Sequence, residues 1–252
     1  MTALFVGLVV FGCVFGGALL GMFVRTRLPH HHLSPDSKDA VKLGMGLIGT
    51  MAALVLGLLV ASAKGSYDAQ SAELTQMSAN VAVLDRMLAL YGPETKEART
   101  QLHGVAARVL DQLWSRDNGA SSSRLAPTST AGETLYATIQ GLSPQNDTQR
   151  SLQNQALGMA IEIGKMRWLM YEQATTAISL PMLVILVLWL TVIFLSFGLF
   201  APSNATVMAS LFVSALSVSG AIFLIMEMYA PYGGLIQVSK APLRAAIAQL
   251  GR

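Results

Sequence analysis

Very few residues of this chain have the types and spacing that catalysis or metal binding requires. His30, His31 and His32 are consecutive. Consecutive side chains rarely direct three rings at one ion, so we expect them to contact the membrane surface or to have no specific role. Cys13 is the single cysteine, which excludes an intrachain disulfide. The sequence contains no nucleophile elbow, phosphate-binding loop or zinc signature. We therefore predict a protein that is not an enzyme and has no metal site or cofactor.

Glu227 is the one charged residue in a long apolar segment that runs from residue 173 to residue 239. An acid inside a membrane helix is a candidate for function, because burying a charge in lipid is costly. Glu227 lies near the end of the membrane helix expected over 206–228, however, where it can also reach the lipid headgroups. It is therefore either a functional intramembrane acid or an interface anchor that pairs with Lys64 or Lys240.

Long uncharged stretches at both ends of the chain predict membrane helices. Residues 2–24, 43–63 and 173–226 contain no Asp, Glu, Lys or Arg, and the last stretch is broken near Pro202. A bilayer core requires about 20 apolar residues per helix, and lipid-exposed backbone must satisfy its own hydrogen bonds. We predict transmembrane helices over 3–24, 42–63, 179–200 and 206–228.

The composition agrees with a membrane protein, since 53% of the 252 residues are hydrophobic and only 12% are charged. Soluble domains have about 25% charged residues. The formal net charge is +3, and the basic residues gather beside the apolar stretches, at Arg25, Arg27, Lys38, Lys42, Lys240, Arg244 and Arg252. This placement favours contact with anionic lipid headgroups rather than nucleic acid.

Apolar residues at heptad spacing predict a helical bundle between the second and third membrane helices. One seam consists of Leu74, Met77, Val81, Leu84, Leu88 and Tyr91, and the other of Leu152, Ala156, Met159, Ile163, Met166 and Met170. Each seam adjoins a membrane helix, so we expect both membrane helices to continue out of the bilayer and to pack antiparallel. Further helices are predicted over 93–117 and 132–141, and Ser143 with Pro144 predicts the start of the second long helix.

The sequence thus predicts an all-α integral membrane protein with four transmembrane helices and a long extramembrane antiparallel bundle between helices 2 and 3. Its parts are residues 1–63 with transmembrane helices 1 and 2, 64–178 with the bundle, 179–228 with helices 3 and 4, and 229–252 as an amphipathic tail. Residues 117–131 are expected to be a polar linker.

Small residues four apart favour close helix packing in lipid. Helix 1 contains two such pairs, Gly12 with Gly16 and Gly17 with Gly21. Helix 2 contains a longer ladder, and helix 4 has Ser210, Ser214, Ser217 and Gly220. These faces pack either within one chain or between subunits around an axis. An uncharged, glycine-rich helix 2 can also line a hydrophobic pore, and its candidate pore-lining or helix-packing residues are Gly49, Thr50, Ala53, Leu54, Gly57 and Ala61. Its candidate pore-end charges are Lys42, Lys64 and Asp68.

Several segments resemble the bestrophin-like domain family of bacterial integral membrane proteins. They are residues 37–64, 67–68, 84–86, 91–94, 233–239 and 242–244. Bestrophins are pentameric anion channels in which the second membrane helix lines an apolar neck and continues into a cytosolic helical domain. Helix 2 here has Leu47, Met51, Leu54 and Leu58 but no aromatic residue, and the acidic cluster that binds calcium in animal bestrophins is not recognisable.

The resemblance and the helix 2 pattern together predict an oligomeric, channel-like membrane protein that passes small anions along an axis lined by helix 2. The expected partners are the lipid bilayer and further copies of the chain, with no nucleic acid. The alternative is a non-conducting membrane scaffold or sensor whose helical bundle binds a protein partner. We expect a multi-pass protein of the bacterial inner membrane, with the bundle and both termini in the cytoplasm.

Overall fold

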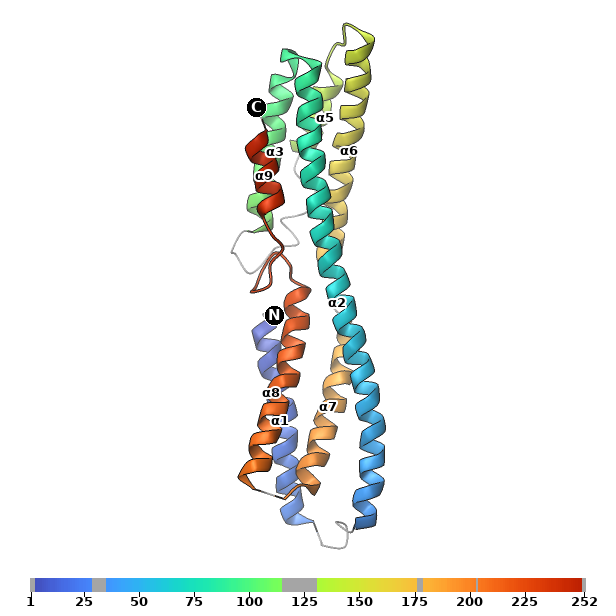
Figure 1. The fold of residues 1–252 in the computed structure, drawn as a ribbon, viewed down its shortest axis with the longest axis vertical. Helices are drawn as coiled ribbons and strands as arrows, with labels where there is room; N and C mark the ends of the chain where they lie inside the picture. The colour runs from blue at the N-terminus through green and yellow to red at the C-terminus, as the bar shows by residue number, and fades with distance from the viewer. Residues whose placement is uncertain (1–2, 29–34, 115–130, 176–178, 203, 251–252) are drawn as a thin grey trace. The chain divides into compact units, whose positions relative to one another are not determined.

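The computed structural model describes residues 3–28, 35–114, 131–175, 179–202 and 204–250, and all regular structure in these ranges is helical (Figure 1). The elements are α1 (Ala3–Arg27), α2 (Pro35–Tyr91), the 3-10 helix η2 (Pro93–Thr95), α3 (Lys96–Leu113), α5 (Ala131–Gln140), α6 (Asp147–Thr175), α7 (Leu180–Phe200), α8 (Ala205–Met228) and α9 (Ala241–Gln249). The predicted all-α fold class is confirmed. The histidine run and the predicted linker lie outside the described residues, except that Ala131 begins α5.

The chain divides into two compact units. The membrane unit comprises Met1–Ser66 and Ala177–Tyr229, and the bundle unit comprises Tyr67–Thr176 and Ala230–Arg252. Helix α2 contributes to both units, and the C-terminal tail groups with the bundle unit. Within the described ranges four helices, α1, α2, α7 and α8, are long and apolar enough to cross a bilayer.

Helix α1 packs against α7 and α8 in the membrane unit. Glycines bring α1 and α7 close together: a Cβ atom at Gly17 would lie 2.9 Å from the Thr191 carbonyl oxygen. A Cβ atom at Gly21 would overlap the Leu195 carbonyl oxygen, and one at Gly198 would overlap the Ala18 carbonyl oxygen. Lipid supplies no hydrophobic drive for helix association, so this close backbone contact stabilises the pair through van der Waals packing.

Other small residues of α1 and α8 make no such close contact with a neighbouring helix of the described chain. Cβ atoms at Gly12, Gly16 and Gly220 would meet no atom within 4 Å. The serines Ser210 and Ser214 of α8 are exposed. Of the two glycine pairs in α1, therefore, the pair Gly17 and Gly21 packs within the chain, whereas Gly12 and Gly16 are available to lipid or to another subunit.

In the bundle unit, α2 and α6 run antiparallel. The Gln149 side chain donates a hydrogen bond of 2.9 Å to the Tyr91 carbonyl, and farther along Asn80 Nδ2 lies 3.7 Å from the sulfur of Met166. All six residues of the first heptad seam are buried, and Ala156 and Met170 of the second seam are buried as well. Helix α5 packs on α3 and α6, and α9 packs on α3. The core therefore joins residues from α2, α3, α5, α6 and α9.

Two predicted helix boundaries are wrong. Helix α6 begins at Asp147 rather than at Pro144, because the Asn146 side chain accepts the backbone N–H of Gln149 at 2.8 Å and acts as the cap. The third membrane helix does not continue from the bundle either. Ser179 has a non-helical backbone (φ −62°, ψ 87°) and α7 begins after it. Pro181 lies in the first turn of α7, where it has no N–H to donate to a preceding turn and its ring would clash with a helical carbonyl four residues back.

Candidate pore surface on helix α2

One face of α2 packs on the membrane unit and holds the helix in place. Ala52, Leu59 and Ala63 are buried in the apolar core of this unit. Near Ala63, the hydroxyl of Tyr229, the residue that follows α8, donates a hydrogen bond of 3.0 Å to the Ser62 hydroxyl. This face fixes which residues of α2 point away from the other helices.

The opposite face of α2 is apolar and exposed. The large side chains there are exposed to 78% (Leu43), 67% (Leu47), 71% (Leu54) and 56% (Leu58). A helix rotates by about 100° per residue, so residues spaced three, four or seven apart share this face. An exposed apolar face of this extent indicates that it contacts lipid, contacts another subunit or itself lines a pore.

The predicted site residues of α2 do not all lie on one face. Thr50, Ala53, Leu54, Gly57 and Ala61 are exposed, and a Cβ atom at Gly57 would meet nothing within 4 Å. Gly49 is different, because a Cβ atom there would lie 4.0 Å from the Cδ1 atom of Ile193 in α7. A four-residue step exceeds one helical turn by about 40°, so the ladder that begins at Gly49 winds from the packing side to the exposed side at Ala61.

The exposed face has no charge between its ends and little polarity. Residues 43–63 contain no Asp, Glu, Lys or Arg. The hydroxyl of Thr50 donates to the Gly46 carbonyl at 2.9 Å, which satisfies its proton within the helix. Lys42, at one end, pairs with Asp39 at 3.2 Å, and both side chains are largely exposed.

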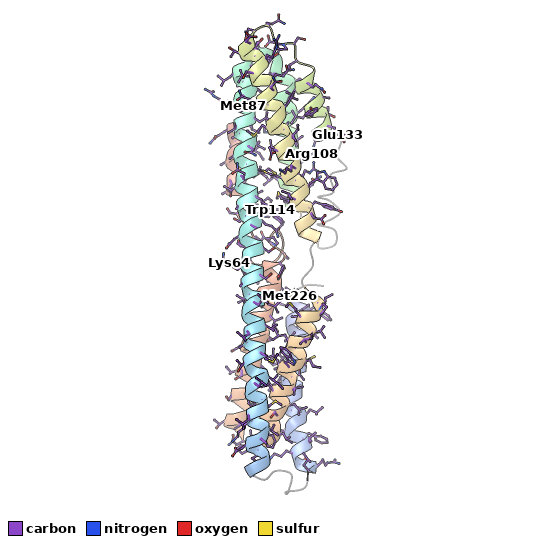
Figure 2. All side chains as sticks on the ribbon, turned by 90° about the vertical axis from the view of Figure 1, so that its right-hand side faces the viewer. Lys64, Met87, Arg108, Trp114, Glu133 and Met226 are labelled. Atoms are coloured by element: carbon purple, nitrogen blue, oxygen red, sulfur yellow. The ribbon has the colours of Figure 1, made fainter. Side chains whose placement is uncertain are left out.

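The remaining predicted charges are Lys64, Asp68 and Glu227. Lys64 is exposed where α2 leaves the membrane unit (Figure 2), and Asp68 is exposed in the part of α2 that belongs to the bundle unit. Glu227 is buried in α8, only 7% exposed. It is therefore packed inside its own unit and does not share the exposed face of α2.

The described residues contain no cluster of three or more His, Cys, Asp or Glu side chains that could hold a metal ion. Cys13 is an exposed free thiol.

Sequence reasoning missed the buried ion pair that positions α3 against α2. Arg99 Nε donates to Asp85 Oδ1 at 2.7 Å and Nη2 donates to Oδ2 at 2.9 Å. Hydrogen bonding to Asp85 raises the pKa of Arg99, despite the opposing effect of burial. The signal in the sequence was an acid in the middle of the first heptad seam, between Leu84 and Leu88, where a charge requires a partner.

Gln153 was also missed. Its side-chain amide donates to the carbonyls of Ile139 at 3.0 Å, Gln140 at 3.2 Å and Leu142 at 2.9 Å. From α6 it therefore satisfies the last two carbonyls of α5 and one carbonyl of the turn that follows. No local sequence pattern indicates this role.

Comparison with known proteins agrees with the resemblance seen in the sequence. A profile of the Bestrophin-like domain matches residues 12–243. The fold is similar to the crystal structure of a bacterial bestrophin homolog from Klebsiella pneumoniae that carries a point mutation, with a TM-score of 0.56, 14% identity, and coverage of 96% of this chain and 97% of that chain. No curated protein matches the sequence. The predicted fold and family are thus confirmed, and the chain belongs to the Bestrophin-like domain family of integral membrane proteins.

Proposed function

We propose that this protein is an oligomeric channel that passes small anions along an axis lined by α2. Membership of the Bestrophin-like domain family supports a channel-like membrane protein in general. The observation that carries the finer proposal is the exposed face of α2, which is apolar and uncharged and lies opposite the face that packs on the membrane unit.

The physical argument concerns how such a face acts when several copies surround an axis. A pore requires a closed ring of subunits. Rings of Leu47, Leu54 and Leu58 would form narrow apolar constrictions, which control permeation by excluding water. Lys42 and Lys64 at the two ends would raise the local concentration of anions relative to cations. The face therefore favours anions by its end charges and gates them by its hydrophobicity.

The experiment is a halide flux assay in liposomes that contain the purified protein. The test variant is Gly57→Trp, since open space around Gly57 lets the chain accept a large side chain without a clash. The matched control is Gly12→Trp, at an equally open glycine of α1. We expect flux in the wild type and in Gly12→Trp, and its loss in Gly57→Trp. Equal flux in all three proteins would exclude α2 as the pore wall.

We also propose that the protein resides in the bacterial inner membrane with the bundle unit and both termini in the cytoplasm. If each of the four candidate helices crosses the bilayer once, the termini and the bundle lie on the same side of the membrane. A reporter fused after Arg252 that is active only in the cytoplasm should be active in cells. Activity of a reporter that works only in the periplasm would reverse this orientation.

A second candidate function is a non-conducting scaffold or sensor. Large apolar side chains are exposed on the bundle unit, at Val83 and Leu90 of α2 and at Ile161, Trp168 and Leu169 of α6. Such a surface would be covered by a partner protein or by a neighbouring subunit. Mass measurement in mild detergent and the halide flux assay together separate the two functions. A monomer without flux supports the scaffold, whereas a ring of subunits supports the channel.

A further inference from the structure

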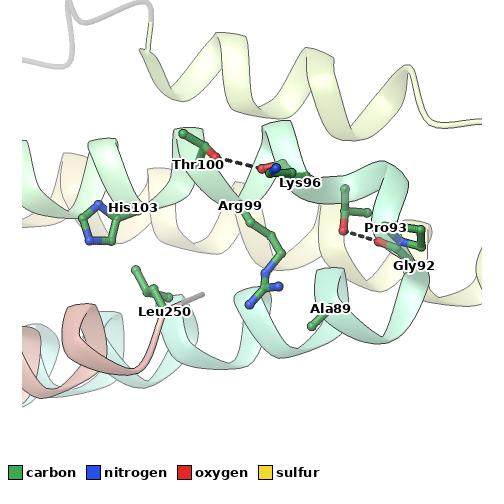
Figure 3. Close-up of a pocket in the computed structure, with 9 residues that line it drawn as sticks. Ala89, Gly92, Pro93, Lys96, Arg99, Thr100, His103 and Leu250 are labelled. Carbon is green, nitrogen blue, oxygen red and sulfur yellow. Dashed lines mark hydrogen bonds between the residues drawn. The ribbon is translucent and has the colours of Figure 1, made fainter. Parts of the chain in front are cut away.

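A pocket of about 590 Å³ lies in the bundle unit beside the start of α3 (Figure 3). Its volume is within the range of roughly 300–1,000 Å³ that is usual for small-molecule sites. Four segments line it. The lining residues include Ala89 of α2, Pro93 of η2, Lys96, Arg99 and His103 of α3, and Leu250 after α9. The pocket belongs to a different unit from the proposed pore surface, so conduction through α2 does not account for it.

The polar side of this pocket is basic. Lys96, Arg99 and His103 lie on one side of α3, at spacings of three and four residues, and line the pocket together. None of the residues that line it is an Asp or a Glu. Lys96 forms no ion pair with any residue that the structure describes. The side chains that reach the pocket therefore favour an anion.

Arg99 is already held in position for such a ligand. Its Nε and Nη2 atoms are held by hydrogen bonds to the buried carboxylate of Asp85. Nη1 has no hydrogen-bond partner within the described part of the chain. In Figure 3 the guanidinium group lies between Ala89 and Leu250. A fixed donor costs less to order on binding than a mobile one, which strengthens binding to a carboxylate or a phosphate.

The other side of the pocket is apolar. Ala89, Pro93 and Leu250 contribute carbon atoms to the wall. An inorganic anion would leave this wall in contact with water, whereas an organic anion would cover it. The combination of a few convergent polar groups with an apolar wall is the usual composition of a small-molecule site.

We propose that this pocket binds a small organic anion, whose carboxylate or phosphate contacts Arg99 and Lys96 and whose apolar part packs against Ala89 and Leu250. Because Leu250 directly follows α9, which packs on α3, the ligand contacts both α3 and the C-terminal segment. A ligand that binds only the docked arrangement stabilises it. Occupancy of the pocket therefore holds the C-terminal helix on the bundle.

The test is calorimetric titration of the purified full-length protein in detergent with phenyl phosphate, with benzoate and with uncharged phenol. The probes share one ring and differ in the head group. Lys96→Gln removes one charge from an exposed side chain, and Ala89→Phe fills the apolar side without changing a charge. Lys165→Gln is the matched control, because it removes the same charge from an exposed position on α6.

We expect phenyl phosphate, benzoate or both to bind, and phenol not to bind. Whichever anion binds identifies the preferred head group. Lys96→Gln should weaken binding about tenfold, as loss of one charge-assisted hydrogen bond implies, and Ala89→Phe should abolish it, while Lys165→Gln should bind as the wild type does. The proposal is overturned if neither anion binds, if phenol binds equally well, or if Lys165→Gln weakens binding as much as Lys96→Gln.

Discussion

Asp85 and Arg99 form an ion pair in which both side chains are largely shielded from water, and its removal should strongly destabilise the bundle unit. The Asp85 side chain is 8% exposed and that of Arg99 is 22% exposed. In Asp85→Asn the guanidinium group stays in the same protein environment but faces a neutral amide. The amide can accept one of the two hydrogen bonds and neutralises no charge.

The magnitude follows from the burial of the pair. Breaking a buried ion pair by removing one partner costs about 3–5 kcal/mol, because the remaining charge is left without compensation. Arg99 retains some contact with water, so we expect a loss near the lower limit, about 3 kcal/mol. For a unit of this size each kcal/mol corresponds to roughly 3–4 °C, and the midpoint of thermal unfolding should fall by about 10 °C.

The measurement is thermal unfolding in detergent followed by tryptophan fluorescence. Of the three tryptophans, Trp114 and Trp168 lie in the bundle unit and Trp189 lies in α7 of the membrane unit. A Trp189→Phe background therefore restricts the signal to the bundle unit. The control is Glu162→Gln, which breaks an exposed pair with Lys165 at 4.0 Å and should change the midpoint very little.

A second variant tests the cause. Asp85→Asn combined with Arg99→Gln removes both charges, so no charge is left unpaired, and the double variant should be more stable than the sum of the two single effects implies. The reasoning is refuted if Asp85→Asn lowers the midpoint no more than Glu162→Gln does. It is also refuted if the effects of Asp85→Asn and Arg99→Gln simply add.

Three further predictions concern the membrane unit and Tyr232 of the bundle unit. Gly21→Ala should destabilise the packing of α1 on α7 by about 1–3 kcal/mol, because its Cβ would overlap the Leu195 carbonyl, whereas Gly12→Ala, in open space, should leave the thermal midpoint unchanged or slightly higher. Burial raises the pKa of Tyr232, so the unfolded chain loses this proton at lower pH than the folded chain. Stability should decrease as pH rises above about 10, and Tyr232→Phe should make that decrease shallower in unfolding measurements. Leu54→Ser should increase halide flux severalfold if it forms an apolar constriction, and unchanged or reduced flux would contradict that role.

The membrane helices could be predicted closely because hydrophobic length alone determines them. Helices α7 and α8 begin and end within a residue of the prediction, since a charge-free run of sufficient length has no other stable form in lipid. The first heptad seam was equally predictable, because its six residues lie along the same side of one helix. Local periodicity therefore located the elements and the buried side of each.

The errors arose where a distant or subtle contact decides the outcome. The start of α6 depended on which of several polar residues caps it, and Asn146 does so through its side chain. The four-residue spacing from Gly49 to Ala61 does not by itself say which members pack and which are exposed, because a helix with 3.6 residues per turn carries such a series partly round the axis. Gln153 caps α5 across a space between two helices, which no pattern along the chain can express.

The sequence by itself determined that this is an all-α membrane protein, which helices are apolar, and that α2 is free of charge between Lys42 and Lys64. These properties depend on composition and spacing along the chain. Only the tertiary structure decided that Leu54 and Gly57 face outward while Gly49 faces α7, that Gly21 rather than Gly12 packs against α7, and that Asp85 holds Arg99 beside a pocket. Each depends on which helix lies opposite, and helices meet through contacts between residues that are distant in sequence.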